Sequence, residues 1–334
     1  MCVFIRDAIR STPHMSPRVT SADGAGVHVR EYLPRALSRD AARERAPKVV
    51  LAHANGFHGG VLEPLARALC DRGYACYALD FRGHGASDAV SVDALTWRAL
   101  ADDCAAVVTA LGLHRCAAFG HSCGGHALLM CEARRPGTFR AIYAFEPIFV
   151  VSSSDVPTLD VSPGSPLMAS TAYMVKSASR RRARFANAAE ALNAYKSKPP
   201  MSAWSEDALD AYVNKGGFVP DDDGGVRLAC STETEIGIYR AGDKETTAFG
   251  ELKNVACPVA IARGRATTPD GASPIYSAVI APAIAAAVRD GRLIEFLDNG
   301  HLAPMEIPRD VARSALDFFD AARGDDDIAA RSKL

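Results

Sequence analysis

The stretch Phe119-Gly120-His121-Ser122-Cys123-Gly124-Gly125 decides the fold prediction for this chain. An apolar run, 116–119, precedes it and predicts a buried strand, and residues 126–133 predict a helix. A serine at a strand-to-helix turn, with a glycine two positions before and after it, matches the Gly-x-Ser-x-Gly nucleophile elbow. The pattern predicts a nucleophilic Ser122 hydroxyl and an oxyanion donor in the N–H of Cys123. The alternative is a glycine-rich turn without function.

Predicted strands alternate with predicted helices on both sides of this stretch. Short connections between such elements favour a parallel sheet with right-handed crossovers. The strands are expected at 26–32, 48–53, 74–80, 116–119, 141–145, 259–263 and 293–297, and the helices at 61–72, 92–111, 126–133, 275–289 and 309–322.

The alternation stops after Glu146-Pro147 and resumes near residue 259. Residues 152–166 are rich in Ser, Asp and Pro and predict a linker, and helices are expected at 169–195 and 205–215. The predicted organisation is a flexible leader (1–24), a sheet core (25–147), a helical cap (148–252), the rest of the core (253–322) and a flexible tail (323–334).

Composition excludes several classes of function. The chain has 334 residues, 48% of them hydrophobic and 23% charged, and its net charge of −1 indicates no nucleic-acid partner. We find no apolar run of the roughly 20 residues that a transmembrane helix needs. The nine cysteines form no C-x-x-C pair, which favours buried thiols over disulfides or a zinc site. We expect no metal and no organic cofactor.

His301 is the predicted general base for Ser122. It follows the last predicted strand in the loop Asp298-Asn299-Gly300-His301, at the sheet edge that also carries the elbow. The alternative is a solvent-exposed loop histidine.

A second oxyanion donor is expected in the loop after strand 48–53, and the N–H of Asn55 is the first choice. The alternative is a plain Asn-Gly turn. Phe57 and His121 are predicted to contact substrate. His121, next to the nucleophile, is also expected to pack beside the elbow rather than to act as the base.

On these motifs the chain resembles the α/β-hydrolase superfamily. The resemblance covers about residues 25–150 and 255–322 and implies a mostly parallel, eight-stranded-type sheet with helices on both faces and an inserted helical cap. It implies a serine hydrolase that cleaves a carboxylic ester or thioester through an acyl-enzyme. The matching stretches are His53-Ala54-Asn55-Gly56-Phe57-His58, residues 80–87, residues 120–125 and residues 300–306.

The triad acid departs from the commonest family pattern. Many members carry Gly-x-x-Asp after the seventh strand, but Thr267 occupies that position here and Asp270 comes three residues later. Other members place the acid after the sixth strand, where this chain has Glu146. We prefer Glu146 as the acid, with Asp270 as the alternative. Either carboxylate could instead be purely structural.

The resemblance leaves the substrate open. A C–C bond hydrolase, a perhydrolase or a receptor-like protein with little turnover would share the fold. The run Arg180-Arg181-Arg182 with Arg184 predicts a solvated helix face or, alternatively, an anion clamp.

The chain ends in Ser332-Lys333-Leu334, the tripeptide by which peroxisomal import receptors recognise their cargo. Together with residues 53–58 it resembles a branch of peroxisomal lipase-like and fungal toxin-biosynthesis hydrolases. The expected location is the peroxisome in a eukaryote and the cytoplasm otherwise.

Overall fold

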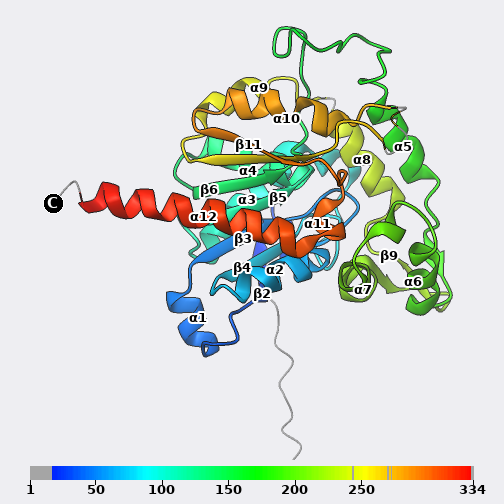
Figure 1. The fold of residues 1–334 in the computed structure, drawn as a ribbon. Helices are drawn as coiled ribbons and strands as arrows, with labels where there is room; N and C mark the ends of the chain where they lie inside the picture. The colour runs from blue at the N-terminus through cyan, green and yellow to red at the C-terminus, as the bar shows by residue number, and fades with distance from the viewer. Residues whose placement is uncertain (1–16, 243, 269–270, 272, 332–334) are drawn as a thin grey trace, which may run out of the picture.

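The central element is a mixed sheet of eight strands (Figure 1). The computed structural model describes residues 17–242, 244–268, 271 and 273–331. The strand order is β1-β2-β4-β3-β5-β6-β10-β11, with β1 and β4 antiparallel to β2 and the other neighbours parallel. The strands are β1 (Arg18–Thr20), β2 (Gly26–Tyr32), β3 (Lys48–Ala52), β4 (Ala75–Asp80), β5 (Cys116–His121), β6 (Phe139–Phe145), β10 (Val259–Gly264) and β11 (Gly291–Phe296).

Both faces of the sheet are covered, as the continuous apolar runs of the central strands require. Val50 of β3 faces one hydrophobic cluster with α3 (Trp97–Ala110), α4 (Cys123–Arg134) and α10 (Tyr276–Ala287). Its neighbours Val49 and Leu51 face the other, with α2 (Glu63–Cys70) and α12 (Pro308–Arg331). The predicted sheet with helices on both faces is confirmed.

The insert between β6 and β10 contains more than helices. It holds α5 (Ser170–Ser179), α6 (Ala188–Lys196), α7 (Glu206–Tyr212), α8 (Thr232–Gly242) and α9 (Ala248–Glu251). It also holds a small antiparallel sheet of β7 (Arg184–Phe185), β9 (Val226–Leu228) and β8 (Phe218–Pro220). Figure 1 shows α5 to α8 gathered on one side of the molecule, beside α11 (Ala303–Glu306).

Several predicted boundaries are wrong. The helix expected at 169–195 is two helices, because the segment between α5 and α6 turns to form β7. The helix expected at 92–111 begins only at Trp97, where the Thr96 side chain accepts the N–H of Ala99 and caps α3. α12 continues to Arg331 instead of ending at residue 322, and the charged segment 38–47, expected as a loop or a short helical insertion, contains the helix α1 (Arg39–Arg45).

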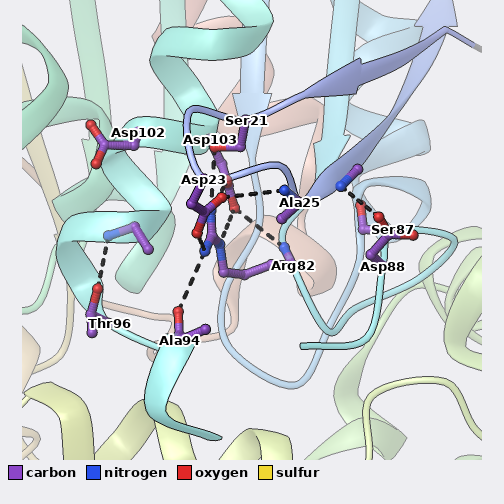
Figure 2. A network of polar contacts seen from close by, with 12 residues as sticks. Ser21, Asp23, Ala25, Arg82, Ser87, Asp88, Ala94, Thr96, Asp102 and Asp103 are labelled. Carbon is purple, nitrogen blue, oxygen red and sulfur yellow. Dashed lines mark hydrogen bonds and ion pairs between the residues drawn. The ribbon is translucent and has the colours of Figure 1, made fainter. Parts of the chain in front are cut away.

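Residues 17–24 belong to the core and not to a flexible leader. β1 pairs with β2, and the Ser21 and Asp23 side chains bind the guanidinium of Arg82 (Figure 2). Asp103 of α3 binds the same group, with Nε of Arg82 3.0 Å from its Oδ2. A guanidinium that is 1% exposed needs such partners, because an unpaired buried charge is costly.

Three predictions lie outside the described residues: the flexibility of residues 1–16, the alternative acid Asp270 and the terminal Ser332-Lys333-Leu334. Within the described ranges, none of the helices combines the length and the apolar character needed to cross a membrane.

Candidate active site

Ser122 occupies the sharp turn between β5 and α4. Its φ of 57° and ψ of −120° are strained for a residue with a side chain, and its N–H donates to the Phe145 carbonyl at 2.9 Å. A Cβ on Gly120 would lie 2.6 Å from the backbone of Gly125, and one on Gly124 would lie 2.6 Å from the His53 carbonyl oxygen. The two glycines are therefore required by close backbone approach, as the sequence pattern predicts.

His301 lies in the loop between β11 and α11, at the carboxyl edge of the parallel strands. Its Nδ1 lies 2.6 Å from Oε2 of Glu146, the first residue after β6. The histidine side chain is 27% exposed, whereas the carboxylate is fully buried. Donation from Nδ1 to the carboxylate leaves Nε2 as the nitrogen that can accept a proton.

The Glu146 carboxylate has three donors. Oε2 also accepts the Ser277 hydroxyl at 2.6 Å, and Oε1 accepts the N–H of Gly264 at 2.7 Å. Burial by itself raises the pKa of Glu146, but the hydrogen bond and charge interaction with His301, together with the hydrogen bonds from Ser277 and Gly264, outweigh it and the pKa is lowered. Glu146 is therefore ionised at neutral pH although it is buried.

His121 does not have the exposure that a substrate contact needs. Its side chain is completely buried, and its Nε2 donates to the His301 carbonyl oxygen at 2.8 Å. Burial lowers the pKa of His121 well below the usual value, so the ring is neutral. The predicted substrate-binding role is corrected: His121 holds the loop that carries His301.

The Asn55 loop lies against the start of α4. The Cys123 thiol points at the His53 carbonyl oxygen, 3.7 Å away. Burial raises the pKa of Cys123 to about 12, and the N–H of Asn55 is among the backbone groups that oppose this rise. The Asn55 N–H therefore lies beside the Cys123 side chain, the thiol is neutral, and the oxyanion role of the two N–H groups stays a prediction.

Two elements outside this loop support it. Asn55 Nδ2 donates to the main-chain oxygen of Glu235 in α8 at 2.9 Å. The Gly56 N–H donates to Nε2 of His84 at 3.1 Å, and Nδ1 of His84 donates to the Arg82 carbonyl at 2.9 Å. Arg82, fixed by its buried ion pairs (Figure 2), therefore holds His84, and His84 in turn holds Gly56 of the Asn55 loop.

Phe57 connects this loop with the insert. Its ring centroid lies 5.3 Å from that of Trp204 and 5.7 Å from that of Tyr212, both in edge-to-face contact. It also stacks on His121, with a centroid distance of 6.5 Å. Phe57 is half-buried, and its substrate contact stays a prediction.

The arginine run forms ion pairs with carboxylates. Arg181 binds Glu235 and donates to the Tyr212 hydroxyl at 2.6 Å. Arg182 lies 2.7 Å from Glu190, and Arg184 lies 3.1 Å from Asp223. These pairs favour a structural role for Arg181, Arg182 and Arg184 over an anion clamp, because carboxylates of this chain already bind their guanidinium groups.

Sequence reasoning missed Ser277, the Gly264 N–H and the contact of Asn55 with Glu235. No local signal marks Ser277, since its partners Glu146 and His301 are distant in the sequence. In the described part of the chain, no group of three or more His, Cys, Asp or Glu side chains could hold a metal ion.

A match to a known protein family covers most of the chain. Residues 49–314 match the protein family described as "Alpha/beta hydrolase family". No curated protein sequence gives a significant match.

Many solved structures share the fold at low sequence identity. An E-2-(acetamidomethylene)succinate hydrolase is 21% identical with a TM-score of 0.69, over 91% of this chain and 98% of that one. A thermophilic esterase from Thermogutta terrifontis is 16% identical with a TM-score of 0.63, over 92% and 98%. A peroxisomal alpha-beta-hydrolase from Saccharomyces cerevisiae is 16% identical with a TM-score of 0.66, over 91% and 84%. At these identities the likeness shows the fold alone.

Proposed function

The chain belongs to the alpha/beta hydrolase family, and on that premise we propose that it is a serine hydrolase of carboxylic esters or thioesters. One observation carries the proposal: Nδ1 of His301 lies 2.6 Å from the buried Glu146 carboxylate, at the sheet edge that presents Ser122 on a strained turn. Such a pair turns a loop histidine into an oriented general base.

In the proposed reaction, Oγ of Ser122 attacks the carbonyl carbon while Nε2 of His301 takes the hydroxyl proton. Glu146 holds the ring and stabilises the imidazolium. The N–H groups of Asn55 and Cys123 bind the oxyanion. His301 then gives the proton to the leaving alcohol or thiol. Water, deprotonated by the same nitrogen, finally cleaves the acyl-enzyme and restores Ser122.

Similar folds support the substrate class, because an esterase and a "Thioesterase Domain From Curacin Biosynthetic Pathway" are among the structural neighbours. Phe57 is half-buried and is backed by the buried rings of Trp204 and Tyr212 at the junction of core and insert. We propose that its exposed part contacts an apolar acyl group.

The test is labelling of the purified protein with a fluorophosphonate, followed by a panel of p-nitrophenyl esters and acyl-CoA thioesters of graded chain length. We expect labelling that Ser122→Ala abolishes and turnover of at least one ester or thioester. Failure of Ser122 to label would overturn the hydrolase proposal. Labelling with turnover confined to C–C or perhydrolysis substrates would move the activity to that chemistry. Tight ligand binding that Ser122→Ala leaves intact, without turnover, would identify a receptor.

We also propose that Ser332-Lys333-Leu334 directs the protein to peroxisomes through the import receptor. In eukaryotic cells, a fluorescent protein fused to the N-terminus should give peroxisomal puncta. Deleting the three residues should make the signal diffuse. A diffuse signal with the tripeptide intact would contradict the proposal.

A further inference from the structure

A buried hydroxyl lies beside the Glu146–His301 pair. Ser277 is the second residue of α10, and only 4% of its surface is exposed. Its Oγ lies 2.6 Å from Oε2 of Glu146 and 3.2 Å from Nδ1 of His301. An ionised carboxylate carries no proton, so the hydroxyl donates to Glu146, and Oε2 receives two donors at once.

We propose that Ser277 is a positioning residue of the hydrolytic site, whose hydroxyl holds the Glu146 carboxylate in the plane that faces Nδ1 of His301. The proposal rests on the hydrolase function proposed above. It assigns Ser277 no contact with substrate.

The geometry explains why a further donor is needed. Glu146 has a φ of 43°, and its own N–H donates a hydrogen bond to the Ala262 carbonyl at 2.7 Å. Its side chain therefore starts from a fixed, strained backbone. The Gly264 N–H holds only Oε1. Ser277 holds Oε2 from a different element, so donors on both oxygens fix the carboxylate plane without relying on the partly exposed His301 ring.

The hydroxyl also sets the electrostatics of the pair. Its hydrogen bond is one of the contacts that lower the pKa of Glu146 against the effect of burial. Without it the pKa of Glu146 rises, so the carboxylate that orients His301 becomes protonated at a higher pH. The acid limb of the pH–rate profile should therefore move upward.

The charged and titratable groups that neighbour the pair in the described residues are bound elsewhere. On β10, Arg263 binds Glu295 of β11 and donates to the Ala278 carbonyl of α10 at 3.2 Å. On β5, the His121 ring lies 4.8 Å from the His301 ring and bonds to the His301 carbonyl. After β10, Arg265 bonds to main-chain oxygens of the His301 loop. On α11, Glu306 accepts from Asn299 at 3.0 Å. None of these contacts involves the Ser277 hydroxyl, so removing it affects directly only its contacts with Glu146 and His301.

The experiment compares Ser277→Ala, Ser277→Cys and Ser277→Thr with the unmodified protein. The readout is the second-order rate constant for Ser122 labelling by a fluorophosphonate as a function of pH, which needs no natural substrate. The Ala variant lacks the donor, the Cys variant has a weak one, and the Thr variant retains the hydroxyl. Ser314→Ala is the matched control, because it also removes a serine hydroxyl from a helix. Ser314 bonds the Tyr143 hydroxyl of β6 at 2.9 Å and has no contact with Glu146 or His301 among its hydrogen bonds in the described structure.

We expect Ser277→Ala and Ser277→Cys to label about tenfold more slowly at neutral pH. Their acid limbs should lie about half to one pH unit higher. Ser277→Thr should restore most of the rate, and Ser314→Ala should leave rate and profile unchanged. The Cys variant decides the outcome if the Ala variant does not fold. Unchanged rates and profiles in folded Ala or Cys variants would overturn the positioning role. Absence of labelling in the unmodified protein would instead reject the hydrolase function itself.

Discussion

Replacing Glu146 by Gln tests the proposed acid most directly, because the side-chain amide cannot satisfy the donors that surround it. Oε1 faces the N–H of Gly264 at 2.7 Å, and Oε2 faces His301 and Ser277, each at 2.6 Å. If the amide nitrogen takes the Oε2 position, it donates to Nδ1 and forces the His301 proton onto Nε2. That tautomer cannot accept a proton from Ser122. If the nitrogen takes the Oε1 position, two N–H groups oppose each other.

The expected loss of kcat is about 10³- to 10⁴-fold, the size known for a wrong tautomer in a catalytic triad. This corresponds to about 4 to 5.5 kcal/mol of activation free energy. Stability should also fall, since each unsatisfied buried donor costs about 1 to 3 kcal/mol. Glu146→Gln is therefore expected to destabilise the folded protein, although the two side chains have nearly the same shape.

The assay combines ester hydrolysis or fluorophosphonate labelling with urea unfolding. Glu132→Gln is the matched control: Glu132 is also a buried carboxylate, and it accepts the N–H groups of Gly137 at 2.8 Å and Phe139 at 2.9 Å, far along α4 from Ser122. It should lose stability and keep its activity per folded molecule. Near-normal activity in folded Glu146→Gln would refute the assignment, and a large loss in Asp270→Asn would transfer the role to Asp270.

Four further outcomes are expected. Ser122→Ala should lower kcat at least about 10³-fold, and Ser122→Gly should be equally inactive. In urea unfolding the Gly variant should be more stable than the Ala variant by about 1 kcal/mol, because Ser122 has a φ of 57° that glycine adopts without strain. Equal stabilities of the two variants would contradict the strain at Ser122. Gly124→Ala should fail to fold or lose activity, because its Cβ would overlap the Ala52 and His53 carbonyls, whereas Gly250→Ala, with open space around it, should express and melt normally. Asn55→Ala should lower kcat about tenfold with little change in KM, because it removes the side chain that holds the loop of Asn55, the proposed oxyanion donor, to Glu235 of α8. A change in KM alone would indicate a role in substrate binding instead. Burial lowers the pKa of His53 and His58 to about 4 and of His84 and His126 to about 3, from 6.5. Below about pH 6.5 the unfolded chain therefore binds more protons than the folded chain. The free energy of unfolding should fall from about pH 6.5 toward pH 4, by up to about 1.4 kcal/mol per pH unit for each histidine. Equal stability at about pH 7 and pH 4.5 would show that these rings are not buried and neutral.

Local pattern was enough for the parts of the protein that depend on neighbours in the chain. The elbow is an example, because the glycines around Ser122 are required by contacts within a strand, a turn and a helix. The alternation of strands and helices likewise predicted the sheet and the edge that carries His301, since parallel strands bring their carboxyl ends to the same side.

Prediction was poorer where short segments depend on distant partners. The three-stranded sheet of the insert forms from strands of two or three residues, too short for a periodic signal. β1 belongs to the core because Ser21 and Asp23 reach the buried Arg82, a contact across about sixty residues that composition alone does not reveal.

The site divides in the same way. Sequence predicted Ser122 as the nucleophile and His301 as the base and left two candidate acids, because a carboxylate after either of two strands can reach the same edge. Only the folded chain places the Glu146 carboxylate against His301, by bending the backbone after β6 to a φ of 43° and bringing Gly264 and Ser277 to its two oxygens. Those donors come from residues more than one hundred positions away, so their hydrogen bonds exist only once the sheet and α10 have packed together.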